Sequence, residues 1–149
     1  MSKTNTWESD LLKLVFNNVS AAGIGDVTGL QASGTAGSLY VSLHTSDPGE
    51  DGYQNTNEAT YTSYARIGVV RSSSGWTVSG TAPTQVVNFA AVTFDQCTGG
   101  SNTITHVGVG TSLNGAGKLL YVGALTSSLA VSNNITPNFV AGALVITED

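Results

Sequence analysis

The strongest constraint on the fold is a period-two alternation of apolar and polar residues that begins at Leu39. Leu39, Val41 and Leu43 recur at every second position, a spacing typical of a half-buried strand. Turn residues separate further runs of this kind, and Asn114-Gly115 is the clearest hairpin signal among them. The predicted strands cover residues 39–44, 64–71, 76–78, 86–94, 104–109, 119–125, 129–135 and 139–147. We therefore expect an all-β fold of about eight strands, an antiparallel β-sandwich or jelly roll.

One helix is predicted ahead of the strands, at residues 6–19. Asn5 or Thr6 is expected to cap it, with Glu8 in the place of a capping-box acid. Apolar residues follow at helical spacing on two faces, Trp7, Leu11, Leu14 and Val15 on the first and Leu12, Phe16 and Val19 on the second. A helix that is apolar on two sides must bury both. One face is expected to pack on the sheet, and the other on a partner or within the same domain.

The length of 149 residues suits a single domain. No internal repeat and no linker divides the part of the chain that follows the helix. We predict an N-terminal arm at residues 1–30 and one β-sandwich domain at residues 31–149.

Charged residues are scarce, at 10% of the chain, with 5 Lys and Arg against 10 Asp and Glu. This acidic balance argues against a nucleic-acid partner, because phosphate binding needs a basic patch. No apolar run reaches the roughly 20 residues of a membrane helix, and the first residues lack the pattern of a secretory signal. We therefore expect no membrane partner and synthesis in the cytoplasm. Cys97, the one cysteine, cannot form an intramolecular disulfide and is expected to be a small buried residue.

Two groups of polar residues are candidates for metal binding or catalysis. The acidic loop, with Asp47, Glu50, Asp51 and, further on, Glu58, supplies oxygen ligands that Ca²⁺ prefers, but a solvated turn explains their spacing better than an ion site does. His44 and His106 lie in predicted strands, and His44 is placed to interact with Asp47. No Gly-x-Ser-x-Gly elbow accompanies either histidine. We predict no catalytic residue, no metal and no cofactor, so the protein is not expected to be an enzyme.

Aromatic residues suggest a further binding mode. Sugar rings stack on aromatic side chains, and five residues could form such a carbohydrate-binding platform: Tyr40, Tyr53, Tyr61, Tyr64 and Trp76. The aromatic content is only 7%, and core or interface positions explain most of these residues better.

Several runs of the predicted sheet carry a family resemblance. They begin with Leu-Tyr-Val-Ser-Leu-His-Thr-Ser-Asp-Pro-Gly-Glu at Leu39, Asn-Glu-Ala-Thr-Tyr-Thr-Ser-Tyr-Ala-Arg-Ile at Asn57, and Gly-Trp-Thr-Val at Gly75. Thr-His-Val-Gly-Val-Gly and Gly-Lys-Leu-Leu-Tyr-Val-Gly-Ala-Leu continue the likeness, which covers residues 36–149. The set resembles a family of small tailed-phage structural proteins, described as capsid decoration (cement) proteins or as tail-fibre proteins. The resemblance implies a virion component and carries no catalytic residue.

From this resemblance we expect a capsid decoration protein that binds the outer capsid surface, stabilises the shell and is made in the host cytoplasm. Its expected partners are the major capsid protein and further copies of itself, in a dimer or trimer. The candidate interface residues are Trp7, Leu11, Leu12, Phe16 and Val19, because large apolar anchors dominate binding energy. The alternative is a tail or tail-fibre component that binds a receptor glycan through exposed tyrosines.

Overall fold

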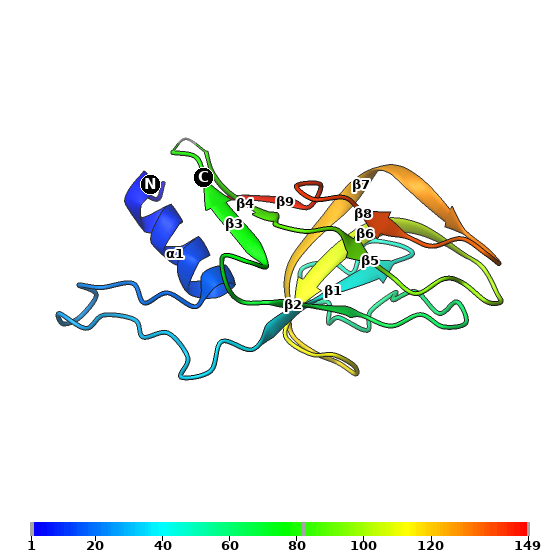
Figure 1. The fold of residues 1–149 in the computed structure, drawn as a ribbon, viewed down its shortest axis with the longest axis horizontal. Coiled ribbons are helices and arrows are strands. Elements are labelled where there is room, and N and C mark those ends of the chain that lie inside the picture. The colour runs from blue at the N-terminus through cyan, green and yellow to red at the C-terminus, as the bar shows by residue number, and fades with distance from the viewer. Residues whose placement is uncertain (1, 82, 149) are drawn as a thin grey trace. The chain divides into compact units, whose positions relative to one another are not determined.

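A computed structural model describes residues 2–81 and 83–148. Within these residues the chain forms one helix, α1 (Asn5–Asn17), and nine strands (Figure 1). The strands are β1 (Ser38–His44), β2 (Ile67–Val70), β3 (Trp76–Ser79), β4 (Thr84–Asn88), β5 (Val92–Thr93), β6 (Asn102–Gly110), β7 (Leu119–Val131), β8 (Asn138–Phe139) and β9 (Val145–Glu148). The predicted all-β class with one short N-terminal helix is confirmed.

The strands pair in three sheets among the described residues, in the orders β2-β1-β6-β7, β3-β4-β9 and β5-β8. The β1–β6, β6–β7, β3–β4 and β4–β9 pairs are antiparallel, as expected. The predicted run 86–94 is divided between β4 and β5, since Phe89, Ala90 and Ala91 lie outside both strands. The run 139–147 is likewise divided between β8 and β9.

The described chain groups into two compact units. Unit 1 comprises residues 2–38, 70–91 and 139–148, and unit 2 comprises residues 39–69 and 92–138. Helix α1 and the sheet β3-β4-β9 lie in unit 1, whereas most of the sheet β2-β1-β6-β7 lies in unit 2. Residues of the segment predicted as one β-sandwich domain occur in both units. The division into an arm at residues 1–30 and a domain at residues 31–149 stays a prediction.

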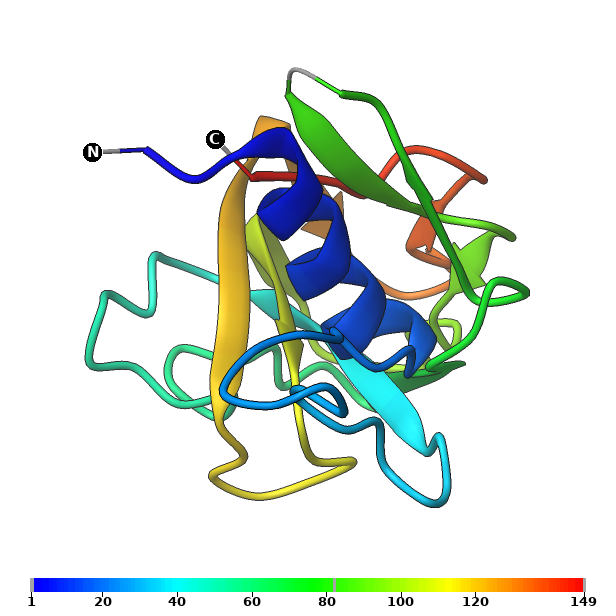
Figure 2. The same cartoon turned by 90° about the vertical axis from the view of Figure 1, so that its left-hand side faces the viewer.

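In unit 1, α1 packs on one face of the sheet β3-β4-β9, across β3 and β4 (Figure 2). The Phe16 ring meets the Trp76 indole edge to face, with centroids 5.0 Å apart. Leu12 and Phe16 are fully buried, so they form part of the core of the chain itself. Of the five candidate interface residues, Trp7 and Leu11 are half-buried and only Val19 is exposed. That α1 contacts a partner stays a prediction. The side chains of Leu12 and Phe16, however, are already buried within the chain.

The start of α1 differs from the predicted capping box. Thr4, and not Asn5 or Thr6, is the N-cap residue, and its side chain makes no capping hydrogen bond. Glu8 is buried against the sheet, where its Oε2 accepts a hydrogen bond of 3.0 Å from the Thr84 hydroxyl. The helix ends at Asn17 because Asn18 adopts the left-handed conformation, with φ of 55°.

Arg71, which follows β2, satisfies carbonyls at the end of α1. Its Nε donates to the Val15 carbonyl at 2.6 Å, and its Nη2 donates to the Leu14 carbonyl at 2.7 Å. The last carbonyls of a helix lack partners within the helix and carry the negative end of its dipole. Since α1 has no basic residue in its own last turn, Arg71 supplies this charge from elsewhere in unit 1.

In unit 2, β1 and β6 pair with Val41 opposite Val109 and His44 opposite His106. The last four residues of β1 are buried on both faces, so the expected half-buried alternation is wrong there. The two predicted strands at 119–125 and 129–135 form one strand, β7, up to Val131. Its register against β6 shifts between Ala124 and Leu129, which explains why the sequence pattern was interrupted there.

The burial of Leu12 gives a direct test of the helix packing. Leu12→Ala should lower the free energy of unfolding by about 2–5 kcal/mol, because it leaves a cavity in the core. Val19→Ala is the matched control, since Val19 is 49% exposed, and should change the free energy by less than about 0.5 kcal/mol. Urea denaturation measures both. Similar effects at the two positions would contradict this packing.

Candidate functional site

Two loops of unit 2 are joined by hydrogen bonds, and we call them the braced loops: residues 45–66, between β1 and β2, and residues 111–118, between β6 and β7. Tyr53 and Lys118 form an isolated antiparallel bridge. Next to it, the Gln54 amide donates to the Gly117 carbonyl at 2.9 Å. Loops on a sheet scaffold are common positions for binding residues.

Gln54 is a fully buried polar residue that connects the braced loops to the sheet. Its side-chain amide donates to the Tyr40 carbonyl at 3.2 Å, and its side-chain oxygen accepts from the Ser112 amide at 2.8 Å. Gly117 must lack a side chain, because a Cβ there would overlap Gln54 and Ser112. Both ends of this side-chain amide are therefore used to fix the loops.

Arg66 and Glu58 form the main electrostatic contact of the braced loops. Arg66 Nε lies 2.6 Å from Glu58 Oε1 and Nη2 lies 2.7 Å from Oε2, a bidentate pair. The same guanidinium donates to the Ser112 carbonyl at 2.9 Å and the Gly115 carbonyl at 2.7 Å. The side chains are only 2% and 15% exposed. Hydrogen bonding to Glu58 raises the pKa of Arg66, so the guanidinium stays charged.

Tyr64 joins this ion pair to the aromatic core of unit 2. Its hydroxyl donates to Glu58 Oε1 at 2.8 Å and accepts the Leu43 amide at 3.0 Å. Its ring meets Tyr61 edge to face at 5.4 Å and stacks on Phe94 at 6.1 Å. Burial raises the pKa of Tyr64 well above its usual value, so the hydroxyl remains a donor to the carboxylate.

His44 is buried and fully hydrogen-bonded, in an arrangement that differs from a catalytic triad. Nδ1 lies 2.8 Å from the Thr56 carbonyl, which can only accept, so Nδ1 carries the proton. Nε2 then accepts from the Ser42 hydroxyl at 2.9 Å. Burial lowers the pKa of His44, which favours this neutral form. Ser42 and His44 are both buried, and the hydrogen bond from His44 to the Thr56 carbonyl holds β1 and the loop together.

Both ring nitrogens of His44 are engaged by Ser42 and Thr56, so the predicted interaction of His44 with Asp47 is wrong. The Asp47 carboxylate instead accepts from the Gly49 amide at 2.9 Å within its own turn. In residues 2–81 and 83–148, no group of three or more His, Cys, Asp or Glu could hold a metal ion. The described part of the chain also contains no helix long and apolar enough to span a membrane.

Core positions account for most of the five candidate aromatic residues, as the sequence favours. Trp76 and Tyr61 are buried and Tyr64 takes part in the contacts above, whereas Tyr53 is 56% exposed on the braced loops. Hydrogen bonds fix the Tyr53 backbone on both sides: its amide donates to the Thr56 hydroxyl at 3.0 Å, and its carbonyl accepts the Thr56 amide at 2.9 Å. Tyr53 is therefore an exposed tyrosine with a fixed backbone, and it follows the exposed Glu50 and Asp51 in the chain.

A family model described as podophage GP4 fiber I protein gp80 matches residues 2–147 of the chain. The chain belongs to this family. No curated protein matches it. The resemblance to tailed-phage structural proteins is therefore confirmed, and the gp80 match also spans α1 and the loop after it, which the sequence motifs did not include. Membership in the gp80 family makes the protein a structural component of a phage virion.

Sequence reasoning missed Gln54 and Arg66, the residues that organise the loops of this gp80-family protein. The one available signal was the rarity of arginine: Arg66 and Arg71 are the two arginines of the chain, and each lies at the end of a predicted strand or close to it. Their partners are mostly backbone carbonyls of other segments, which leave no sequence pattern, and the one carboxylate, Glu58, is eight residues from Arg66 outside any regular element.

Removing the charge of Glu58 should loosen the braced loops. Glu58→Gln leaves the Arg66 guanidinium buried with neutral partners only, and we expect a loss of about 3 kcal/mol in the free energy of unfolding. Faster hydrogen exchange at the Ser112 amide should accompany it. Glu50→Gln, on an exposed acid of the same segment, is the control and should change stability by less than about 0.5 kcal/mol. Equal effects would contradict the bracing role.

Proposed function

We propose that this protein is a fibre component of a podophage virion, and that its braced loops contact carbohydrate on the host surface. The observation that carries the first part is the match to the fibre family over residues 2–147. It favours a fibre over the capsid decoration expected from the sequence, since the matching family is described as a fibre protein. A role in binding rather than catalysis fits the buried, satisfied state of His44 and Ser42.

The carbohydrate contact is supported by the exposed side chain of Tyr53 and by the exposed carboxylates of Glu50 and Asp51, which precede it closely in the chain. An aromatic face covers the apolar side of a sugar, and carboxylates accept hydrogen bonds from its hydroxyls. Because Gln54 and the Arg66–Glu58 pair already hold the loops, little conformational entropy is lost on binding. Many copies on a virion would add avidity to a weak single contact.

Immunogold labelling of intact virions tests the location. We expect gold on fibres that project from the particle. Gold spread evenly over the capsid shell would overturn the fibre assignment and would support capsid decoration with the major capsid protein as partner.

A glycan array tests the carbohydrate contact. Tyr53→Ala should weaken binding about tenfold or more, since it removes the stacking surface. Tyr53→Phe keeps the ring and should retain most of the binding. A wild-type protein that binds no glycan, or an alanine variant that binds as well as wild type, would overturn this part and leave the fibre assignment intact.

A further inference from the structure

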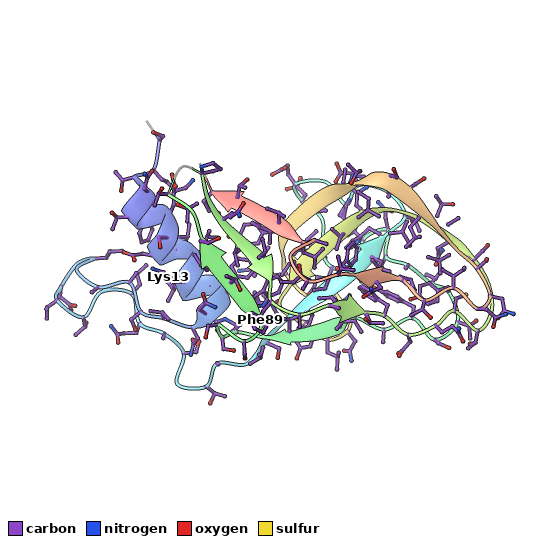
Figure 3. All side chains as sticks on the ribbon, turned by 45° about the horizontal axis from the view of Figure 1, so that its top comes forward. Lys13 and Phe89 are labelled. Carbon is purple, nitrogen blue, oxygen red and sulfur yellow. The ribbon has the colours of Figure 1, made fainter. Side chains whose placement is uncertain are left out.

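An exposed asparagine–glycine pair, Asn114 and Gly115, lies in the loop between β6 and β7 of unit 2. Asn114 is the one asparagine of the chain that precedes a glycine. Each of the others precedes a residue with a Cβ, as Asn88 precedes Phe89 at the end of β4 (Figure 3). The Asn114 side chain takes no part in the contacts that brace the loops, so its amide is available for chemistry.

The backbone nitrogen of Gly115 is uncrowded. Gly115 has φ of 72°, a conformation that glycine adopts without strain, and no atom lies within 4 Å of the position that a Cβ would take. Within residues 2–81 and 83–148, its amide donates to no backbone carbonyl. The glycine of the related pair Asp51–Gly52 differs, because the Gly52 amide donates to the Gly49 carbonyl at 3.1 Å.

An unengaged backbone nitrogen next to an asparagine can displace the side-chain amide. The Gly115 nitrogen forms a bond to Asn114 Cγ as the Cγ–Nδ2 bond breaks, and the proton from the attacking N–H leaves with Nδ2 as ammonia. Water then opens the resulting succinimide ring. Attack of water at Cγ gives aspartate, whereas attack at the backbone carbonyl carbon gives isoaspartate, in which the main chain runs through Cγ. Water is the one reagent that the reaction consumes.

Arg66 holds the main chain on both sides of Asn114. Its Nη1 donates to the Ser112 carbonyl at 2.9 Å, and its Nη2 donates to the Gly115 carbonyl at 2.7 Å. Isoaspartate adds one methylene group to the main chain between these two carbonyls. The guanidinium is a planar fork whose donors point in fixed directions, so it cannot follow both carbonyls when their separation changes. A donor of this buried charge then loses its acceptor, which destabilises the loops.

We propose that Asn114 is a site of spontaneous deamidation and that its isoaspartate product loosens the braced loops. The new carboxylate is ionised at neutral pH and adds a negative charge to a chain whose net charge is already −5. A virion outside its host replaces none of its proteins, so modified copies accumulate with time. The inference goes beyond the proposed function and requires no carbohydrate contact.

Ageing the full-length protein in warm, mildly alkaline buffer tests the modification. Peptide mapping by mass spectrometry should detect the conversion of the Asn114 amide to a carboxylate. Asn133 is the internal control, since it is exposed like Asn114 but precedes Asn134. If Asn114 keeps its amide, or changes no faster than Asn133, the inference is overturned.

Hydrogen exchange at the Ser112 amide tests the loosening, because this amide donates to Gln54 in the braced loops. Exchange should be faster in aged than in fresh wild-type protein. Asn114→Gln should prevent the change, since its longer side chain closes the larger ring far more slowly. Fresh Asn114→Asp carries the new charge on a normal main chain and should exchange like fresh wild type.

Two results would overturn the loosening. One is equal exchange in fresh protein and in aged protein that mapping shows to be modified at Asn114. The other is faster exchange in fresh Asn114→Asp, which would assign the effect to the charge and not to the lengthened main chain. Both measurements stand whatever the glycan array shows.

Discussion

Arg66 carries a full positive charge into the interior of unit 2, and the arrangement of the surrounding loops depends on how that charge is satisfied. Removing a guanidinium from water costs several kcal/mol, and only a well-aligned set of acceptors offsets it. Both Glu58 oxygens and the Ser112 and Gly115 carbonyls supply that set. These acceptors come from separate segments, so the loops must come together for the charge to be satisfied. Tyr64 and Gln54 then attach the same loops to the sheet.

Unit 1 uses an arginine in a related way. Arg71 donates to two carbonyls in the last turn of α1 and to the Ala36 carbonyl, so it orders both the helix end and the chain that leads to β1. Lys3 pairs with Glu148 at 3.1 Å. Three of the five cationic residues therefore serve contacts within the chain. Charged residues are few in this chain, and most of its cations stabilise the fold.

The sequence predicted features that depend on residues close together in the chain. It did not predict features that depend on contacts between residues far apart in the chain. The strands at 39–44 and 104–109 and the helix were found because periodicity depends on neighbouring residues. The interface residues were harder to assign, because Leu12 and Val19 have the same pattern in the sequence and differ only in what packs over them. Glu8 was expected in a capping box, yet the nearby Thr84 hydroxyl offers it a buried partner. The sequence favoured core positions for most tyrosines, and Tyr64 does pack with Tyr61 and Phe94, but which tyrosine stays exposed depends on these long-range contacts.

By itself, the sequence determined the all-β class, the positions of most strands, the short N-terminal helix and the relationship to phage structural proteins. These depend on local alternation, turn residues and short motifs, which can be read without knowing any long-range contact. Only the tertiary structure decided that Arg66 joins Glu58 to the 111–118 loop, that Tyr53 is the exposed ring on the braced loops, and that Val27 and Phe89 face solvent. Burial and charge pairing are properties of residues that are distant in sequence, so they appear only once the chain has folded.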